Sequence, residues 1–381
     1  MNYDYIITGS GCAGLSLLYR ILKDPELRRK SILVIDKSPK NTNDRTWCFW
    51  EKEQGLFEEV VFHQWKKLEF LSDDFSETSG LGDYSYKMIR SIDFYRLVLS
   101  FAEKFKNVTF KYEDVLKISS EKNYPFVETD KGTYTAEFVF NSTGLFNPDI
   151  NTENSLLQHF EGWVIKTEQP VFDQEVGTLM DFRLSQKNGT TFMYVLPTSS
   201  NQALIEYTLF SEKLLEKSEY KLELENYIKD YLKIDSYELL EKEFGVIPMS
   251  LASFSRHPKA DKRIVNLGTA GGFTKASSGY TFQFIQKNTA EIVENLRKGR
   301  APHPKVSFHE KLYQLYDRTL LDVMISGKLD GKFIFATMFK KLPFESILAF
   351  LGNESSFVLD LKIMNTMPAL TFMKAGIRSL K

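Results

Sequence analysis

The sequence has few cysteines and histidines and almost no net charge, which excludes several classes of protein. Two cysteines in 381 residues exclude a disulfide framework and a cysteine-rich zinc site. The 49 Lys and Arg nearly balance the 50 Asp and Glu, so a net charge of -1 gives no electrostatic basis for binding nucleic acid. The five histidines are scattered and form no H-x-x-x-H pair, so we expect no metal site.

Long apolar runs are also missing. The longest run without a charge, residues 188–205, is rich in Asn, Thr, Ser and Gly and does not read as a membrane span. No basic segment or cleavage site precedes the first apolar strand, so we expect no signal peptide. These features favour a cytoplasmic protein, either soluble or attached to a membrane surface. Aromatic residues are plentiful at 14%, which core filling or genome base composition could equally explain.

A dinucleotide-binding fingerprint lies at the start of the chain. An apolar strand over residues 3–8 runs into the segment GSGCAG and then into a helical pattern. The three fingerprint glycines are Gly9, Gly11 and Gly14. Glycines at this spacing allow a tight turn and a close approach of the backbone to a pyrophosphate. A second apolar strand, 31–35, ends at Asp36, whose carboxylate can accept from ribose hydroxyls. This order predicts a Rossmann-like domain for FAD or NAD.

Later segments return to the pattern of that domain. FVFNSTG ends an apolar strand at Gly144, and RIVNLGTAGG repeats the shape before a helical stretch that runs from Gly279 to about Arg297. Such returns resemble FAD enzymes of the glutathione-reductase and aromatic-hydroxylase type, although Gly268-Thr269 stands where those proteins have Gly-Asp. The further cofactor-binding residues that this resemblance implies are Arg45, Gly144, Gly268, Gly271 and Gly279.

The remaining segments predict an α/β fold with an insertion. Short strands over 160–210 favour a mostly antiparallel substrate-binding sheet, followed by a charged helix at about 211–233. Asp93 can cap a helix that reaches Lys104, and Pro343 and Gly352 interrupt a helical C-terminal region. The predicted division is a discontinuous FAD-binding domain over 1–45, 82–150 and 255–300, a sheet domain over 46–81 and 151–254, and a helical region over 301–381.

Two acids inside apolar strands are candidates for chemistry. Glu206 lies in ALIEYTLF and shares a strand face with Thr208, whereas Asp181 lies in LMDFRL. Burial among apolar side chains would raise the pKa of such a carboxyl and make it a proton donor near neutral pH. The structural alternatives are a lysine partner at a sheet edge for Glu206 and a salt bridge to Arg183 for Asp181.

Taken together, these segments resemble the flavin-dependent lycopene cyclases of bacteria and plants over most of the chain. The matching segments are GSGCAGLSL, DRTWCFW, QHFEGW, MDFRL, FMYVLP, LIEYT, FGVIPM and GTAGGFTKASSGYTF. LIEYT is the most specific, because the family signature places its essential carboxylate at the position of Glu206. The second acid of that signature is Tyr207 here. This departure suggests either that the second carboxylate is dispensable or that Asp181 assists from the neighbouring strand.

The resemblance implies an isomerase that acts on lycopene and related acyclic carotenoids. A proton from Glu206 would start closure of each end to a β-ionone ring, giving γ-carotene or β-carotene. The family needs reduced FAD, with NADPH or NADH as reductant, although no net redox change occurs. An FAD-dependent monooxygenase, a polyprenyl or geranylgeranyl reductase, and a non-catalytic flavin- or lipid-binding protein are the alternatives.

A carotenoid substrate implies contact with the inner face of the cell membrane. The Phe- and Lys-containing stretches 332–350 and 361–376 suit helices that lie on a bilayer, although an ordinary helix over the core explains them equally well. Aromatic faces expected near the polyene are Phe192, Tyr194, Tyr207, Trp163, Tyr280 and Phe282.

Overall fold

The computed structural model describes residues 2–121 and 124–380. Its first sheet has the strand order β8-β2-β1-β11-β10-β9, with β17 also paired to β11. Its strands are β1 (Asn2–Thr8), β2 (Ile32–Asp36), β8 (Val108–Tyr112), β9 (Val115–Glu121), β10 (Tyr124–Thr129), β11 (Thr133–Asn141) and β17 (Ile264–Asn266). The pairs β8–β2, β2–β1, β1–β11 and β11–β17 are parallel. Every residue of β2 is buried, as expected for a central parallel strand with both faces covered.

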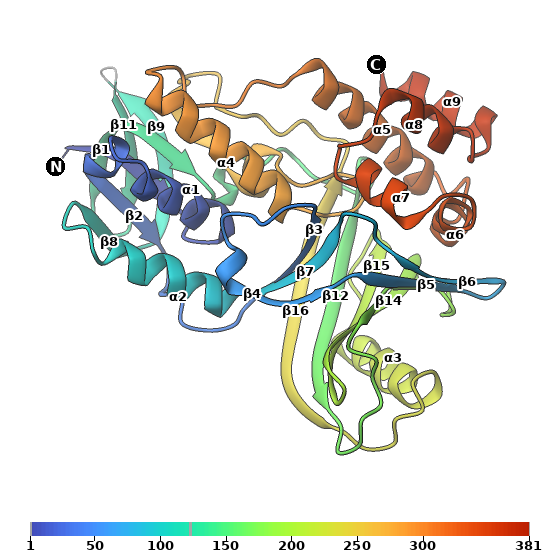
Figure 1. The fold of residues 1–381 in the computed structure, drawn as a ribbon. Helices are drawn as coiled ribbons and strands as arrows, with labels where there is room; N and C mark the ends of the chain where they lie inside the picture. The colour runs from blue at the N-terminus through green and yellow to red at the C-terminus, as the bar shows by residue number, and fades with distance from the viewer. Residues whose placement is uncertain (1, 122–123, 381) are drawn as a thin grey trace.

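Three helices pack on this sheet on the side that faces the viewer in Figure 1. They are α1 (Cys12–Lys23), α2 (Ser91–Ala102) and α4 (Phe282–Arg297). Helix α2 begins at Ser91, two residues before the predicted cap. Asp93 lies in its first turn, where it pairs with Arg90 at 2.6 Å. The prediction that Asp93 caps this helix is therefore wrong.

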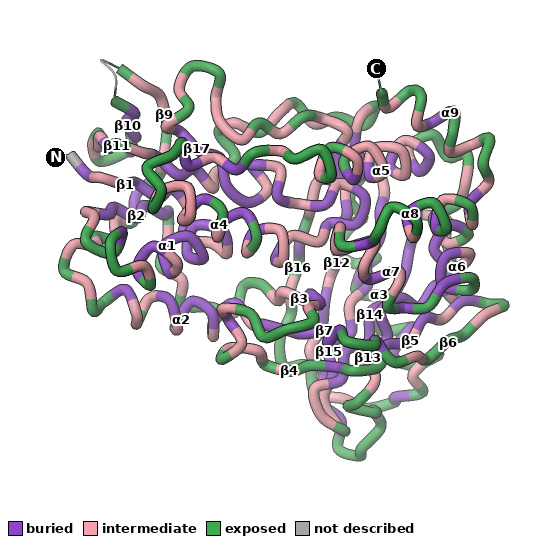
Figure 2. The backbone as a smooth tube through the Cα atoms, turned by 45° about the horizontal axis from the view of Figure 1, so that its top comes forward, coloured by how far each residue is buried: buried purple, intermediate pink, exposed green. Residues whose placement is uncertain are grey.

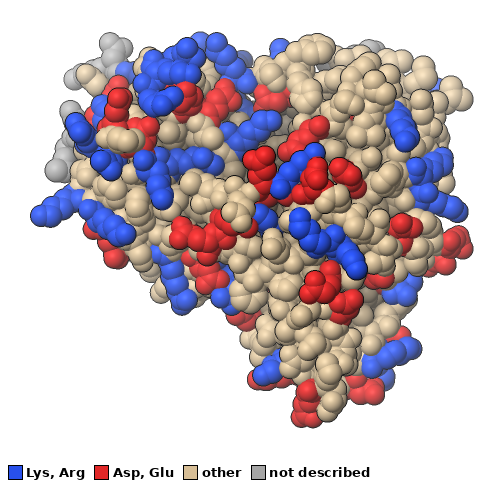
Figure 3. Space-filling model, in the orientation of Figure 1, with Lys and Arg blue, Asp and Glu red and all other residues tan. Residues whose placement is uncertain are grey.

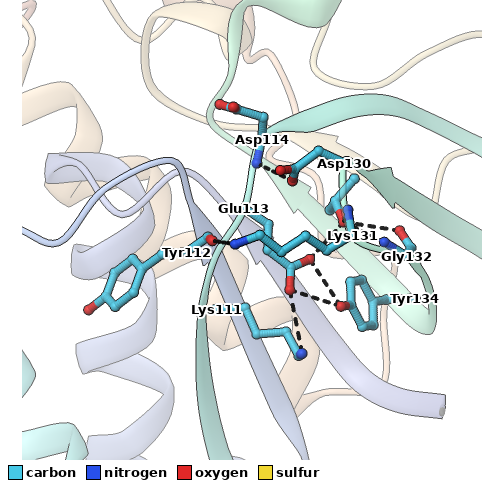
Figure 4. Close-up of polar contacts among 9 residues, drawn as sticks. Lys111, Tyr112, Glu113, Asp114, Asp130, Lys131, Gly132 and Tyr134 are labelled. Carbon is cyan, nitrogen blue, oxygen red and sulfur yellow. Dashed lines mark hydrogen bonds and ion pairs between the residues drawn. The ribbon is translucent and has the colours of Figure 1, made fainter.

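A polar cluster around Glu113 joins the turn between β8 and β9 to β10 and β11 (Figure 4). The Glu113 carboxylate accepts hydrogen bonds from Thr129 Oγ1 at 2.6 Å and from the Tyr134 hydroxyl at 3.0 Å. The backbone N–H of Glu113 donates to the carbonyl of Asp36 at 2.9 Å. The cluster thus fixes the strand end that carries the predicted ribose-binding acid.

The second large sheet has the strand order β16-β12-β15-β14-β13-β5-β6 and is antiparallel except for the pair β13–β5. Its strands are β5 (Lys67–Ser72), β6 (Phe75–Gly80), β12 (Ser155–Lys166), β13 (Val176–Asp181), β14 (Thr190–Ser199), β15 (Gln202–Ser211) and β16 (Glu238–Ser250). A three-stranded sheet made of β3 (Thr46–Glu51), β7 (Ser85–Arg90) and β4 (Val61–Trp65) lies between the two large sheets (Figure 1).

Different helices cover the two faces of this second sheet. One face packs against α3 (Lys217–Asp230), through a cluster that includes Met193, Tyr207 and Tyr227. Toward the other face lie helices of the C-terminal region, whose side chains share a buried cluster with Phe192 and Tyr194. The central strands are accordingly buried along most of their length (Figure 2).

The C-terminal region is helical, as predicted. Its helices are α5 (Phe308–Ile325), α6 (Gly331–Lys341), α7 (Phe344–Leu351), α8 (Phe357–Met364) and α9 (Ala369–Ser379). Pro343 caps the start of α7 and Gly352 its end, so both predicted breakers lie at helix boundaries. No helix in the described part of the chain is both long and apolar enough to cross a membrane. The predicted α/β fold class, with an inserted sheet and a helical C-terminal region, is confirmed.

Candidate active site

The glycine-rich turn packs as its sequence requires. Gly9 has a φ of 90°, in the region that favours glycine, and a Cβ on Gly14 would overlap the Gly9 carbonyl. Gly11 caps the start of α1, whose first N–H groups therefore point toward the turn. The turn and the helix N-terminus together form the kind of site that binds a pyrophosphate.

Asp36 holds this turn from the end of β2. Its Oδ2 accepts hydrogen bonds from the Ser10 N–H at 2.6 Å and from the Ser10 hydroxyl at 2.9 Å, and Lys40 Nζ lies 3.4 Å from Oδ1. Burial would raise the pKa of Asp36, but the hydrogen bonds from Ser10 and the charge of Lys40 outweigh it and lower that pKa. Asp36 is therefore an anion fixed beside the glycine-rich turn.

The segment from Gly268 to Gly279 borders a cavity that the glycine-rich turn also lines. Gly268 has a φ of 55°, and a Cβ there would press on Ala13. Gly279 has a φ of 72°, and a Cβ there would overlap Gln158 Oε1. Within the described residues, Gln158 Oε1 and the Ser278 hydroxyl are buried without a hydrogen-bond partner. Unpaired polar atoms beside a glycine cradle fit a polar cofactor such as FAD.

The other predicted cofactor residues are more scattered. Arg45 is exposed at the rim of the cavity, and its guanidinium donates to the Asp44 carbonyl at 2.6 Å. Gly144 begins a short 3-10 turn outside the lining of the cavity. Gly271 packs against the Asn266 carbonyl and lines a second pocket of about 220 Å³ on the far side of the Thr269 turn.

A cavity of about 490 Å³ joins the dinucleotide turn to the second sheet. Gly11 and Gly268 lie at one end of its lining, and Glu206 on β15 and Glu243 on β16 lie at the other. One continuous space thus connects the glycine-rich turn with two carboxylates. Its volume is in the range of small-molecule sites.

Glu206 faces this cavity, as the predicted strand alternation requires. Its Oε1 accepts a hydrogen bond from the Thr208 hydroxyl at 2.7 Å, which confirms that the two side chains share a face. Burial, together with the nearby charge of Glu243, raises the pKa of Glu206 to about 8. Among the described residues, no cation contributes to the pKa of Glu206. The geometry favours a carboxyl that carries its proton at neutral pH.

Sequence reasoning missed Glu243. It directly opposes Gly162 on β12, and Gly162 in turn opposes Glu206 on β15, so all three positions share one face of the sheet. Burial raises the pKa of Glu243 to about 7, although its Oε1 accepts from the Thr46 N–H at 3.1 Å. The segment FGVIPM, which follows Glu243 directly, was the only nearby signal in the sequence.

Aromatic side chains line the cavity beside Glu206. Tyr194 directly opposes Glu206 on β14, and its hydroxyl lies 3.4 Å from that of Tyr280. The Trp50 ring meets the Tyr280 ring edge-on at 4.6 Å between centroids. Burial raises the pKa of Tyr280 to about 12, so its hydroxyl is neutral. Tyr194, Tyr280 and Phe282 thus lie where an apolar substrate would need π faces.

Asp181 lies on the opposite face of the sheet. It opposes Met193, which opposes Tyr207, and both of these pack toward α3. Its Oδ2 accepts from Arg183 Nη2 at 2.6 Å and from the Tyr227 hydroxyl at 2.6 Å. The expectation that Asp181 assists Glu206 from the neighbouring strand is therefore corrected: strand β14 separates the two, and the salt bridge to Arg183 is present.

Two of the predicted aromatic contacts also need correction. Trp163 and Tyr207 belong to the cluster under α3, on the face away from the cavity. Trp163 lies one residue beyond Gly162, and Tyr207 lies one residue beyond Glu206, so strand alternation turns both of them away. Phe192 remains on the cavity side of the sheet, next to Tyr194 at 5.3 Å between ring centroids.

The fold is that of FAD-dependent flavoproteins. A geranylgeranyl bacteriochlorophyll reductase-like protein from Thermoplasma acidophilum superposes with a TM-score of 0.63 at 13% identity and covers 98% of both chains. A flavoprotein/dehydrogenase from Cytophaga hutchinsonii gives a TM-score of 0.64 at 13% identity, over 99% of this chain and 98% of that one. At such identities the likeness concerns the fold alone.

The family follows from the sequence comparison. The family model described as lycopene cyclase protein matches residues 4–376, so the chain belongs to the lycopene cyclase family. A lycopene beta-cyclase from Pantoea ananas is 22% identical over 98% of this chain and 97% of its own length. A chloroplastic lycopene beta cyclase from Nicotiana tabacum is 23% identical over 73% of this chain, and the match spans 57% of the tobacco protein.

Proposed function

We propose that this chain is a lycopene β-cyclase that closes the acyclic ends of lycopene to β-ionone rings without net redox change. The observation that carries the proposal is Glu206, a carboxyl with a raised pKa in a cavity that begins at the dinucleotide turn. Such an acid can protonate an alkene, and membership of the lycopene cyclase family supplies the substrate class. The reaction would be an isomerisation, because every atom of the substrate stays in the product.

Glu206 would start the reaction as a general acid. The hydrogen bond that Thr208 donates to Oε1 orients the carboxyl and stabilises its anion after the proton has left. The proton adds to the terminal double bond of the polyene and leaves a tertiary cation. The neighbouring alkene attacks that cation and closes a six-membered ring, and loss of a proton from the ring gives the product.

The cavity walls suit the cationic stage. Rings such as those of Tyr194 and Tyr280 would each stabilise a nearby cation by about 0.5–2 kcal/mol when water is absent. Both hydroxyls keep their protons, because burial raises the pKa of each. The wall therefore presents π faces and no anionic oxygen from tyrosine that could trap the cation.

The residues present fit FAD. The turn at Gly9–Gly14 would bind the pyrophosphate, and Asp36 would bind the ribose. Gly268 and Gly279 would leave room for the remainder of the cofactor. When bound in its reduced form, with NADPH or NADH as electron source, FAD would supply an electron-rich ring that offsets the cation. The N-terminus of α4 reaches the cavity at Thr281 and Phe282, and its dipole would stabilise a negative charge there by about 0.3–2 kcal/mol.

A surface on α8 and α9 suits contact with the inner face of the cell membrane. The exposed apolar side chains of this α8–α9 surface are Phe357, Val358, Leu361, Leu370, Met373, Ile377 and Leu380. Lys362 and Lys374 lie exposed among them and could meet acidic headgroups. In Figure 3 the upper right corner, where Figure 1 places these helices, is largely free of charged atoms.

The other stretch considered for the membrane is placed differently. Within 332–350, Phe335, Met338 and Phe339 of α6 are buried in the core, as are Ile347 and Leu348 of α7. These helices therefore cap the second sheet, and we restrict the proposed contact to the α8–α9 surface. Serine at Leu370, Met373 and Ile377 should reduce flotation with phosphatidylglycerol-containing vesicles. Serine at Leu116 and Leu222, which are also exposed but lie outside this surface, should not, and equal flotation of both variants would argue against this surface.

Expression in a bacterial host that accumulates lycopene tests the main proposal. A shift of the pigment from red to orange-yellow, with monocyclic or bicyclic carotene by chromatography, is the expected result. Unchanged lycopene beside folded, flavin-loaded protein would overturn it. A monooxygenase or a polyprenyl reductase would instead consume NAD(P)H in proportion to product, whereas the cyclase needs only enough reductant to keep the flavin reduced.

A further inference from the structure

Two carboxylates project into one cavity from either side of a missing side chain. Strand β12 lies between β15 and β16, and Gly162 on β12 directly opposes Glu206 on one side and Glu243 on the other. A Cβ on Gly162 would lie 3.5 Å from Glu206 Oε2 and 3.1 Å from Leu204 Cδ1. The missing side chain therefore lets the Glu206 carboxyl and Leu204 lie over β12, on the face that also carries Glu243. Two strand spacings place their Cα atoms about 10 Å apart.

The surroundings of Glu243 differ from those of Glu206. Its Oε1 accepts the Thr46 N–H, and Arg45 contributes a positive charge on the outer side, against a negative one from Asp44. Glu206 instead has the Thr208 hydroxyl and the neutral groups of Cys48, Tyr194 and Tyr280. A backbone donor and a nearby cation favour the carboxylate form of Glu243 more than a single hydroxyl favours that of Glu206.

We infer that Glu243 is the base of the proposed cyclisation, which takes the ring proton after Glu206 has given its own proton to the polyene. This inference rests on the proposed function. Both carboxyls line the same cavity, so a ring held there between them would have one on each side. The carbon that gains a proton and the carbon that loses one could then face different acids. Asp181 is excluded from this role, because it lies on the other face of the sheet.

The steps balance in atoms and electrons. The O–H bond of Glu206 breaks as a C–H bond forms at the terminal alkene, and the neighbouring π pair becomes the ring C–C bond. A C–H bond next to the final cation then breaks, its electrons form the ring double bond, and its proton moves to the Glu243 carboxylate. Transfer of that proton from Glu243 to Glu206 restores the starting state. The Thr46 N–H and the nearby Arg45 favour the carboxylate form of Glu243, so the resting proton favours Glu206.

The test compares Glu243→Gln with Glu241→Gln in purified, flavin-loaded protein supplied with lycopene. Glu241 lies two residues earlier on β16 and is exposed, where it accepts from Asn43. We expect Glu243→Gln to cyclise about 100-fold more slowly and to lose the rise in rate with pH near 7. We also expect its product to contain ring double-bond isomers, because the cation can lose a proton from another adjacent carbon. Glu241→Gln should match the wild type.

Glu243→Asp keeps the carboxylate and tests whether the role is only structural. If Glu243 is the base, Asp at this position should recover part of the rate and the rise near pH 7, even if the Gln variant folds poorly. Wild-type rate, product and pH profile in Glu243→Gln would overturn the inference while leaving the cyclase proposal intact. Equal slowing by Gln and Asp, with the pH profile of the wild type, would also overturn it. Absence of cyclic product from the wild type would reject both.

Discussion

Each face of the second sheet carries an acid that lies within an apolar strand, and the two acids have opposite surroundings. On the α3 face, Asp181 is fully buried and meets Arg183 and the Tyr227 hydroxyl, each at 2.6 Å. On the cavity face, Glu206 meets one hydroxyl and lies near a second carboxyl, that of Glu243. The sequence context of the two acids is similar, since both lie in apolar strands. Only their partners separate a structural acid from a candidate catalytic one.

The physical reason is the cost of burying a charge. A paired carboxylate with satisfied hydrogen bonds keeps its charge, and removing it leaves the partner cation without compensation. A carboxyl without a cation avoids the cost by holding its proton. The first arrangement contributes to folding, whereas the second stores a proton beside a cavity at a cost in stability. The comparison therefore predicts opposite results for matched Asn and Gln substitutions on the two faces.

The largest effect is expected for Glu206→Gln. The amide cannot donate a proton to an alkene, so cyclisation should fall by about 100- to 10,000-fold. The measurement is the conversion of lycopene by purified protein at matched flavin loading. Glu212→Gln, an exposed change just beyond the same strand, is the control and should retain full activity. Substantial turnover by Glu206→Gln would show that a group other than Glu206 is the acid.

The same variant should be more stable than the wild type at high pH. The pKa of Glu206 is about 8 in the folded chain against an ordinary value of about 4.5, so the unfolded chain releases this proton at lower pH. The free energy of unfolding therefore falls as the pH rises from about 4.5 through 8, by about 5 kcal/mol at most. Urea unfolding should show that the free energy of unfolding of Glu206→Gln, relative to that of the wild type, is higher at pH 9 than at pH 6. A loss of stability at pH 9 would contradict the unpaired state of this carboxyl.

Much of this arrangement could be predicted from the sequence because it depends on local patterns. The order of strand, glycine turn, helix and acid at Gly9–Asp36 follows from backbone requirements that only a few residue types meet. Alternation along β15 correctly placed Glu206 and Thr208 on one face. The breakers Pro343 and Gly352 marked both ends of α7 for the same local reason.

The partners of each acid could not be predicted, because they depend on strand order. Asp181 was expected next to Glu206, but β14 lies between their strands, and a difference of one residue in register turns a side chain to the other face. Glu243 lies in EKEFG, which reads as an exposed charged stretch. Its importance follows only from the pairing of β16 with β12 opposite Gly162.

On the α3 face, Asp181→Asn should reduce stability and leave the chemistry intact. The amide would leave Arg183 without its anion and would weaken the hydrogen bond from Tyr227, at a cost of about 2–4 kcal/mol, since Arg183 is partly exposed. Urea unfolding measures the loss, and the rate per folded molecule should stay within about twofold. Asp230→Asn at the exposed end of α3 is the control and should leave stability unchanged. A folded Asp181→Asn protein that binds lycopene without cyclising it would show that Asp181 takes part in the reaction. It would contradict the proposed difference between the two faces of the sheet.

The smallest effect is expected for Thr208→Val, which changes the hydrogen bonding of Glu206 and leaves its carboxyl in place. The Thr208 hydroxyl donates at 2.7 Å and lowers the pKa of Glu206, against the larger opposite effect of burial. Removing the hydroxyl should raise that pKa further, by up to about one unit for a hydrogen bond worth about 1.4 kcal/mol. Since the protonated form is the acid, the fall in rate at high pH should move upward by the same amount. Thr191→Val on the α3 face, where the hydroxyl donates to the Gly189 carbonyl, should leave the profile where it is. An alkaline limit that does not move with Thr208 would mean that a group other than Glu206 sets it.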